Sequence, residues 1–411
     1  MANKWRPLLA ALAAAGLAGS AHAQWKPELR FSGFGTLGAV HSDDRNADFV
    51  GTIFQPNGAG FTRSTSLNPD TKLGVQLDAT FTERFSGVVQ MVAQHHHDNT
   101  YMPKVEWANL KFQVTPELSV RGGRIAAPSF LYSDTRFVGY AQPWVRPPVE
   151  VYGVLPITSN DGIDVMYRSA IGPTTNTVQA YYGRARARLR TGQVESRPSW
   201  GINDVVQWND WTFRAGYTHN TVDLNLPGLA ALTNGARAFT AIPGPIGQQA
   251  AAFVARYSGR DVELGAMSLS ASYDPGQWFA MSEVVRLSGE DILADSTSWY
   301  LAGGYRFGAF TPYAVYARTR SKVATEPGIP VPAAAPLNAG INAALRNQFN
   351  GTQSTLTAGL RWDFRKNTAL KVQVDHISLG DNSAGRFANV QPGFQRGGSV
   401  NLFSVALDFV F

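Results

Sequence analysis

The stretch 355-TLTAGLRWDF-364 carries the pattern that decides the fold of this chain. Every second residue in it is apolar, namely Leu356, Ala358, Leu360, Trp362 and Phe364. Because successive side chains of an extended strand point to opposite sides, these groups share one face and the intervening polar residues share the other. A helix with 3.6 residues per turn would mix the two sets. The stretch therefore predicts a β-strand with one apolar and one polar face.

The same alternation recurs along the chain, most clearly at residues 72–81 and 403–411. Sixteen such spans are predicted: 29–41, 71–82, 85–94, 103–114, 118–126, 162–169, 175–184, 202–208, 211–221, 261–273, 277–288, 297–307, 310–320, 353–364, 368–379 and 400–411. Residues 202–208 and 261–288 alternate poorly, so fourteen or eighteen strands remain alternatives. An even number of two-faced strands is typical of bacterial single-chain barrels. The sequence predicts an all-β fold, a transmembrane antiparallel β-barrel of about sixteen strands.

The predicted strands are joined alternately by short and long connections. Short links such as 115–117 and 365–367 have the chemistry of tight turns. The long stretches are polar or rich in Gly and Pro, and they cover 42–69, 127–160, 223–259 and 321–351. Outer-membrane barrels place short turns on the periplasmic side and long loops outside. This alternation favours a membrane barrel over a sandwich of two sheets.

Composition excludes several other classes of protein. Only 16% of the 411 residues are charged, below the roughly 25% of soluble domains. Lys and Arg number 36 against 30 Asp and Glu, which gives a net charge of +6. No apolar run beyond the N-terminus reaches the about 18 residues that a membrane helix needs. The chain has no cysteine, so disulfides and thiolate chemistry are excluded.

The N-terminus has the three parts of a secretory signal peptide. Lys4 and Arg6 precede an apolar segment at residues 8–18, and Ala21-His22-Ala23 forms an A-x-A cleavage site. We therefore expect residues 1–23 to be a signal peptide. The mature chain, residues 24–411, is expected to form one barrel.

These features together resemble the general porins of Gram-negative outer membranes. The likeness rests on the signal peptide, the first strand Phe31-Ser32-Gly33-Phe34-Gly35, the sixteen-strand rhythm, a long third loop and the aromatic last strand ending at Phe411. The resemblance implies a homotrimer in the outer membrane, in contact with lipid and lipopolysaccharide. It also implies that the barrel-assembly machinery recognises Phe411. The Pro-Glu-Phe-Gly-Gly stretch that many enterobacterial porins carry in the third loop is absent.

Strand alternation predicts which charged side chains face the water-filled interior. The expected basic ones are Lys72, Lys111, Arg121, Arg168, Arg214, Arg306, Arg361 and Lys371. The expected acidic ones are Asp78, Asp164, Asp363, Asp375 and Asp408. Eight positive charges against five would raise the local concentration of anions in a narrow passage. Neutralisation within pairs such as Arg361 and Asp363 is the alternative interpretation.

Residues 127–160 form the candidate constriction loop, which is expected to fold into the barrel. The segment is dense in aromatic, charged and proline residues, including Tyr132, Asp134, Arg136, Tyr140, Trp144, Arg146 and Glu150. We predict that Arg121 and Arg124 on the wall face Asp134 or Glu150 on the loop, which would create a transverse electric field. The alternative is an extracellular loop that packs on its neighbours.

Two further clusters have less specific interpretations. Arg184, Arg186, Arg188 and Arg190 recur at every second residue and share one face of a strand. They are consistent with an anion-attracting mouth, with contact to lipopolysaccharide phosphates, or with a solvated edge. Residues 95–97 are three histidines in a row, but adjacent side chains on a strand diverge, so a metal site is not expected. No cofactor is implied.

The predicted function is that of a porin, a passive diffusion channel for ions and small hydrophilic solutes that leans weakly towards anions. A substrate-selective porin for small organic anions is the main alternative, and a non-conducting structural or adhesive barrel is another. An enzyme is not expected, because His41, His219 and His376 lie in no recognisable catalytic motif. Nucleic acid is not an expected partner of an exported barrel.

Overall fold

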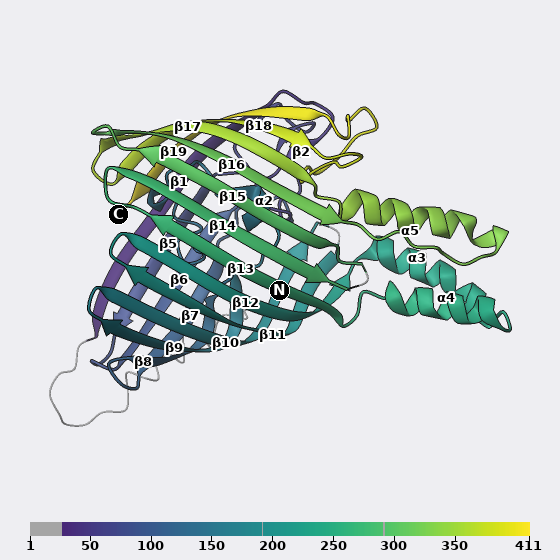
Figure 1. Cartoon of the computed structure of the whole chain (residues 1–411), viewed down its shortest axis with the longest axis horizontal. Helices are drawn as coiled ribbons and strands as arrows, with labels where there is room; N and C mark the ends of the chain where they lie inside the picture. Colours follow the sequence, from purple (N-terminus) through teal and green to yellow (C-terminus); the bar gives the residue numbers. More distant parts are fainter. Residues whose placement is uncertain (1–26, 191, 291) are drawn as a thin grey trace.

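The computed structural model describes residues 27–411 except 191 and 291, and it forms a closed antiparallel barrel (Figure 1). The first and last long strands pair with each other, with Phe34 opposite Val410, and this pairing closes the sheet. The sixteen barrel strands in the described ranges are β1 (Glu28–Ser42), β5 (Lys72–Thr80), β6 (Phe85–Gln94), β7 (Lys104–Gln113), β8 (Leu118–Ala126), β9 (Ser159–Ile171), β10 (Thr174–Leu189), β11 (Gly192–Trp208), β12 (Trp211–Asn225), β13 (Val262–Tyr273), β14 (Trp278–Gly289), β15 (Asp295–Tyr305), β16 (Phe310–Lys322), β17 (Gln353–Arg365), β18 (Thr368–Leu379) and β19 (Ser399–Val410). The predicted sixteen-strand barrel is confirmed. The signal peptide predicted at 1–23 lies outside the described residues.

Burial along the strands is inverted relative to a soluble protein. Leu356 is 57% exposed on the outside, whereas its neighbour Thr357 is 7% exposed on the inside. Large apolar side chains cover the outer face all round, including Leu37, Leu73, Leu110, Ile163, Leu269, Leu301, Val374 and Phe403. An apolar exterior with every strand paired is what a lipid bilayer requires of a sheet. None of the helices in the described part of the chain has the length and apolar character needed to cross a membrane.

Aromatic rings seal the junction between the first and last strands. A Cβ added to Gly33 would lie 2.2 Å from the ring of Phe411, and one added to Gly35 would lie 2.4 Å from the ring of Phe409. The backbone N–H groups of Gly33 and Phe411 donate to each other's carbonyl oxygens at 2.9 and 3.0 Å. The two glycines therefore leave the space that the C-terminal rings fill, and the first strand is bonded to the last residue of the chain.

The connections differ in length at the two ends of the barrel. Seven links of two to four residues lie at one end, which we call the turn end. The longer segments lie at the opposite end, the loop end, where the connections are numbered in chain order. They are L1 (43–71), L2 (95–103), L3 (127–158), L5 (226–261), L7 (323–352) and L8 (380–398), and the fourth and sixth connections are short. L1 contains the short strands β2 (Asp48–Phe49), β3 (Ala59–Gly60) and β4 (Thr65–Ser66), the last of which pairs with β1.

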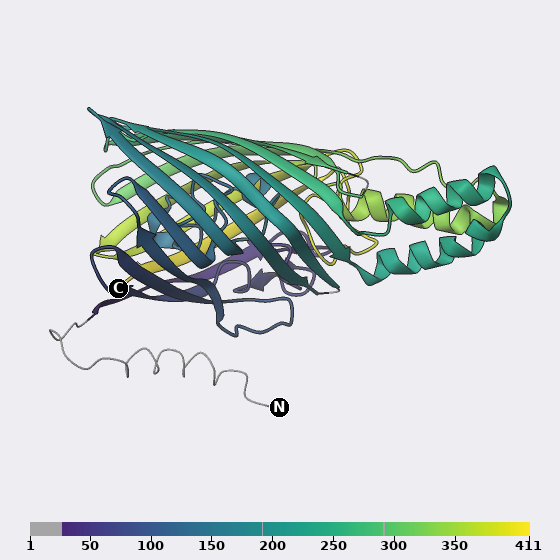
Figure 2. The ribbon, with the colours of Figure 1, turned by 90° about the horizontal axis from the view of Figure 1, so that it is seen from below.

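L5 and L7, which the sequence predicts only as long connections, are helical. L5 contains α3 (Pro227–Arg237), η2 (Ala238–Ala241) and α4 (Pro245–Arg256), and L7 contains η3 (Pro332–Ala334) and α5 (Ala335–Gln348). These helices lie side by side and project beyond the loop end (Figure 2). A core that includes Leu229, Phe253, Tyr257, Ile341 and Leu345 holds them together. The prolines of these two loops include those at the helix starts, where a missing N–H costs nothing.

The helical projection is expected to loosen in acid because of one carboxylate. Glu326 accepts hydrogen bonds from Arg256 at 2.7 Å and Tyr257 at 2.8 Å. Burial opposes its ionisation, but bonds from the Gly328 N–H, Tyr257 and Arg256 outweigh burial and lower the pKa of Glu326. Because the pKa of Glu326 is lower in the folded chain than in the unfolded chain, its charged carboxylate stabilises the fold at pH values above the unfolded pKa of about 4.3. This stabilisation is lost as the pH falls through the folded pKa.

Hydrogen exchange of α4 at a series of pH values checks this expectation. Intrinsic-rate-corrected exchange of α4 in the native chain should rise below about pH 4 relative to neutral pH. The variant Glu326→Gln should show faster exchange already at neutral pH and little further acid response. An unchanged acid response in Glu326→Gln would contradict the assignment to this carboxylate.

Candidate functional site

The third loop, L3, enters the barrel and packs on one side of its inner wall. It contains η1 (Gly139–Ala141) and α2 (Val149–Tyr152). Trp144 is 1% exposed and meets the ring of Tyr300 edge-on, with ring centroids 5.8 Å apart. Phe130 and Tyr152 join them in a cluster with inward residues of β14, β15 and β16. The wall at β14–β16 thus carries an apolar patch on its inside as well as on its outside, and L3 covers the inner patch. The buried Glu283 on β14 accepts hydrogen bonds from the Leu131 N–H and the Tyr152 hydroxyl of L3, each at 3.1 Å.

Arg146 attaches L3 to L1 and to the barrel wall through two buried carboxylates. Its guanidinium donates to Asp70 at 2.7 and 2.9 Å, to Asp375 on β18 at 2.8 Å and to Ser404 on β19 at 2.6 Å. The Arg146 side chain is only 8% exposed. It also lies over the ring of Phe49, 4.9 Å from the centroid. Such fully bonded, charge-assisted contacts are the strongest hydrogen bonds available to a protein.

Lys371 is a second buried attachment point. The side chain is fully buried, and its Nζ donates to the carbonyl oxygens of Gly139 at 2.7 Å and Trp144 at 2.9 Å. The same ammonium lies 2.7 Å from Asp408, which also accepts a 2.5 Å bond from Thr36. A Cβ at Gly139 would lie 2.2 Å from Asp408, so only glycine allows L3 to approach the wall this closely.

Two further polar contacts attach L3 to β17. Arg361 donates to the carbonyl oxygens of Tyr140 at 2.7 Å and Gln142 at 2.9 Å. Glu150, 1% exposed, accepts hydrogen bonds from Gln353 and Thr355 on β17. Together with Arg146 and Lys371, these contacts hold L3 against β17, β18, β19 and β1.

The wall away from these attachments keeps exposed or half-exposed charges. Arg121 on β8 stands opposite Lys111 on β7, and both lie on the inward face. Arg168 on β9 is exposed on the same face. Arg121 donates to Asp164 on β9 at 2.5 to 3.1 Å. Asp134 on L3 is exposed and interacts electrostatically with Arg121. This side of the interior therefore pairs a basic wall with a carboxylate on L3.

The sequence matches the model of a protein family whose description agrees with this closed barrel. The family model described as Gram-negative porin matches residues 9–382 of the chain. The chain belongs to the Gram-negative porin family. It is therefore an outer-membrane channel protein, as expected from the sequence. A comparison with curated protein sequences gave no match.

Several solved structures share the fold of this porin at low sequence identity. The anion-selective porin from Comamonas acidovorans is 12% identical, with a TM-score of 0.56 over 94% of this chain and 100% of that one. Salmonella typhi OmpF in complex with daunomycin is 11% identical, with a TM-score of 0.55 over 93% and 97%. A trimer form of OmpT from Vibrio cholerae is 12% identical, with a TM-score of 0.52 over 94% and 99%.

Several basic residues predicted to line the pore instead form hydrogen bonds that attach L3 to its surroundings. Lys371, Arg361 and Arg146 bind L3 backbone or buried carboxylates, as described above. Arg214 is 5% exposed and donates to the Pro128 carbonyl oxygen and to Ser268. Their inward direction was predicted correctly, but L3 fills the interior at their height. The expectation that these side chains face water is wrong.

The predicted pairing of Arg121 and Arg124 with loop carboxylates also needs correction. Residues three apart on a strand point to opposite faces, so Arg124 points outward when Arg121 points inward. Arg124 donates to Asp161 on the outer face at 2.6 Å. Glu150 is occupied by β17, as shown above. Only the proximity of Arg121 and Asp134 remains from that hypothesis.

The remaining predicted site residues occupy three kinds of position. Arg136 donates to the Tyr152 carbonyl oxygen at 2.7 Å, so it braces L3 rather than crossing the opening. Arg306 forms an exposed ion pair with Asp274 at the turn end, 2.7 Å long. Lys72 faces inward on β5 and is half-buried.

Tyr300 and Asp70 also belong to the site but were not predicted from the sequence. For Tyr300 the signal is its aromatic ring at an inward strand position, which indicates that another part of the protein covers the wall there.

Proposed function

We propose that this porin is a passive diffusion channel for ions and small hydrophilic solutes with a weak preference for anions. The observation that carries the proposal is the excess of positive charge on this inward wall, where Lys111, Arg121 and Arg168 stand against one carboxylate, that of Asp164, which is bonded to Arg121. Positive charge on a low-dielectric wall raises the local concentration of anions and lowers that of cations. Since L3 occupies the other side, solutes would pass along this wall.

Single-channel recording of the refolded mature chain under a salt gradient tests this function. Stepwise openings with a reversal potential of anion-selective sign are expected. Openings of cation-selective sign would keep the channel but overturn the role of the basic wall. A folded, heat-modifiable barrel that never conducts would instead support the structural or adhesive alternative.

We propose further that the chain assembles as a homotrimer in contact with lipopolysaccharide. The trimer form among the structural neighbours supports this assembly. Arg184, Arg186 and Arg188 are exposed on the outward face of β10 near the loop end, where lipid phosphates would lie. The exposed ring of Phe411 at the junction of the strands is accessible to the barrel-assembly machinery. Crosslinking of the protein in native outer membranes would distinguish a trimer from a monomer.

A further inference from the structure

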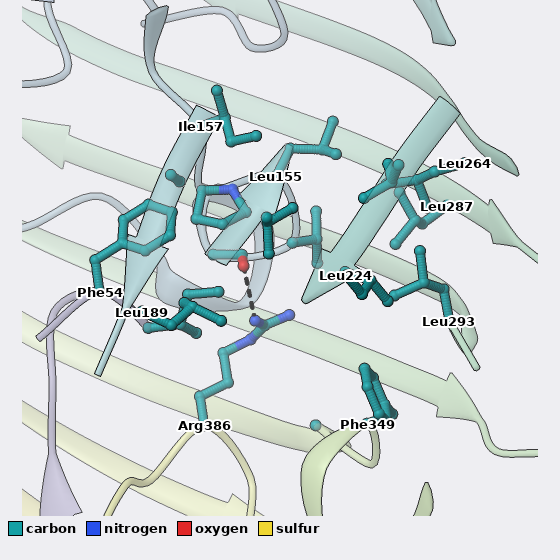
Figure 3. Close-up of a pocket in the computed structure, with 18 of the residues that line it drawn as sticks. Phe54, Leu155, Ile157, Leu189, Leu224, Leu264, Leu287, Leu293, Phe349 and Arg386 are labelled. Atoms are coloured by element: carbon teal, nitrogen blue, oxygen red, sulfur yellow. Dashed lines mark hydrogen bonds between the residues drawn. The ribbon is translucent and has the colours of Figure 1, made fainter. Parts of the chain in front are cut away.

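A large cavity lies on the loop side of L3, within the outer mouth of the barrel. Its volume is about 780 Å³, within the range of small-molecule binding sites. Residues from L1, L3, L5, L7 and L8 surround it together with the inward faces of β10 to β14. We call this space the vestibule, and Figure 3 shows the side chains that line it.

The vestibule is far more apolar than a passage for hydrated ions requires. Its lining includes Phe54, Leu155, Ile157, Leu189, Leu224 and Leu264 (Figure 3). On β10 the usual arrangement is reversed at this height. Leu189 and its inward neighbours are apolar, while the outward residues are exposed arginines. Apolar groups on the inside gain free energy only if something apolar covers them.

The charged groups that line the vestibule have one sign. Among the described lining residues, Arg190 and Arg386 are the charged ones, and no Asp or Glu is present. Arg386 reaches in from L8, and its guanidinium points towards the apolar side chains (Figure 3). It donates from Nη1 to the Gly153 carbonyl oxygen at 2.9 Å, but its buried Nε has no hydrogen-bond partner within the described part of the chain. An anion in the vestibule would instead meet the accessible edge of this half-buried guanidinium, which forms no ion pair with a carboxylate of the described residues. A charge-assisted hydrogen bond to that edge would be favourable.

We propose that the vestibule binds small organic acids that carry one carboxylate on an apolar body, such as an aromatic ring or a short branched chain. The carboxylate would lie against Arg386, and the apolar body would cover Leu155, Leu189 and Leu224. A sugar or a free phosphate would leave these apolar side chains uncovered. This inference rests on the proposed channel function, because the vestibule lies on the route into the pore.

Current block by benzoate tests the proposal on the intact channel. Benzoate added at the loop end should reduce the potassium chloride current saturably. Benzyl alcohol, which lacks the charge, and acetate, which lacks the ring, should block far more weakly. The variant Arg386→Gln should raise the half-blocking concentration of benzoate roughly ten- to a hundredfold, as expected for removal of a charge-assisted bond. Block is expressed relative to each variant's own current.

Arg365→Gln is the matched control, because Arg365 is exposed at the turn end and does not line the vestibule. This control should be blocked like the native channel. Leu189→Ser should weaken benzoate block without affecting block by acetate. A benzoate effect that does not saturate, or equal block in Arg386→Gln and the native channel, would overturn the proposal.

Calorimetric titration of benzoate into the detergent-solubilised barrel separates this proposal from the channel function. Saturable binding that Arg386→Gln abolishes would support the site even if the barrel did not conduct. Conductance without benzoate binding would overturn the site and leave the channel function standing.

Discussion

Replacing Arg146 by alanine is expected to detach L3 from the wall and to destabilise the barrel. The substitution leaves Asp70 and Asp375 buried without their counter-charge, and both are bonded to Arg146 at under 3 Å. Breaking a buried ion pair from one side typically costs about 3–5 kcal/mol. Without the Arg146 guanidinium to bind it to β18 and β19, L3 should fluctuate within the pore.

Two measurements check the Arg146→Ala prediction. The free energy of unfolding in denaturant should fall by about 3 kcal/mol or more, and single-channel traces should become larger in amplitude and noisier. Arg306→Ala is the matched control, because it breaks an ion pair of similar length whose partners are 37% and 45% exposed. The control should be destabilised by no more than about 1 kcal/mol. Native-like stability and traces in Arg146→Ala would show that the aromatic contacts of L3 suffice to hold it.

The barrel could be predicted because its determinants are local. The side-chain period of two is visible within ten residues, as at 355–364, and each strand pairs with its neighbour along the chain. All sixteen predicted spans overlap an observed strand, including 202–208, where alternation is poor. A strand is still expected at 202–208, because the strands predicted on either side of it must each have a partner if the sheet is to close without an unpaired edge.

The helices of L5 and L7 could not be predicted in the same way, because their core comes from two distant segments. Ile341 and Leu345 of α5 pack with Leu229 and Phe253, about a hundred residues earlier in the chain. Each helix alone is short, and helices of that length gain most of their stability from such packing. The alanines in these loops fit helices, but the adjacent glycines and prolines favour turns equally well.

The sequence predicts the direction in which the side chains of the candidate site point, but not what surrounds them. Alternation correctly gives Lys371 and Arg361 an inward direction, yet it does not say whether water or protein lies there. The partners of Lys371 on L3 are more than 220 residues away along the chain. Arg124 is different, because the period of two already places it on the face opposite Arg121. Its misassignment was avoidable from sequence alone.

Reversing two charges on the basic wall is expected to reverse the ion selectivity of the pore. In the variant Lys111→Glu/Arg168→Glu, both inward side chains change sign, and neither forms an ion pair with another described residue. Arg121 is left unchanged because it is bonded to the buried Asp164, and a glutamate there would put two carboxylates together. The chloride-to-potassium permeability ratio should fall by roughly tenfold, the lower end of what charged clefts achieve in local ion concentration.

The reversal potential in a salt gradient measures this change, and the matched control is Arg184→Glu/Arg188→Glu. The control alters the net charge by the same amount on the outward face of β10. The barrel wall and salt screening separate these charges from the pore, since the Debye length at 0.1 M is only about 10 Å. Native selectivity in the control with reversed selectivity in the inward variant would assign ion preference to the wall opposite L3. If the inward variant kept native selectivity, the preference would have to arise at the mouth instead, where Arg190 and Arg386 are the charged groups among the described residues that line the vestibule.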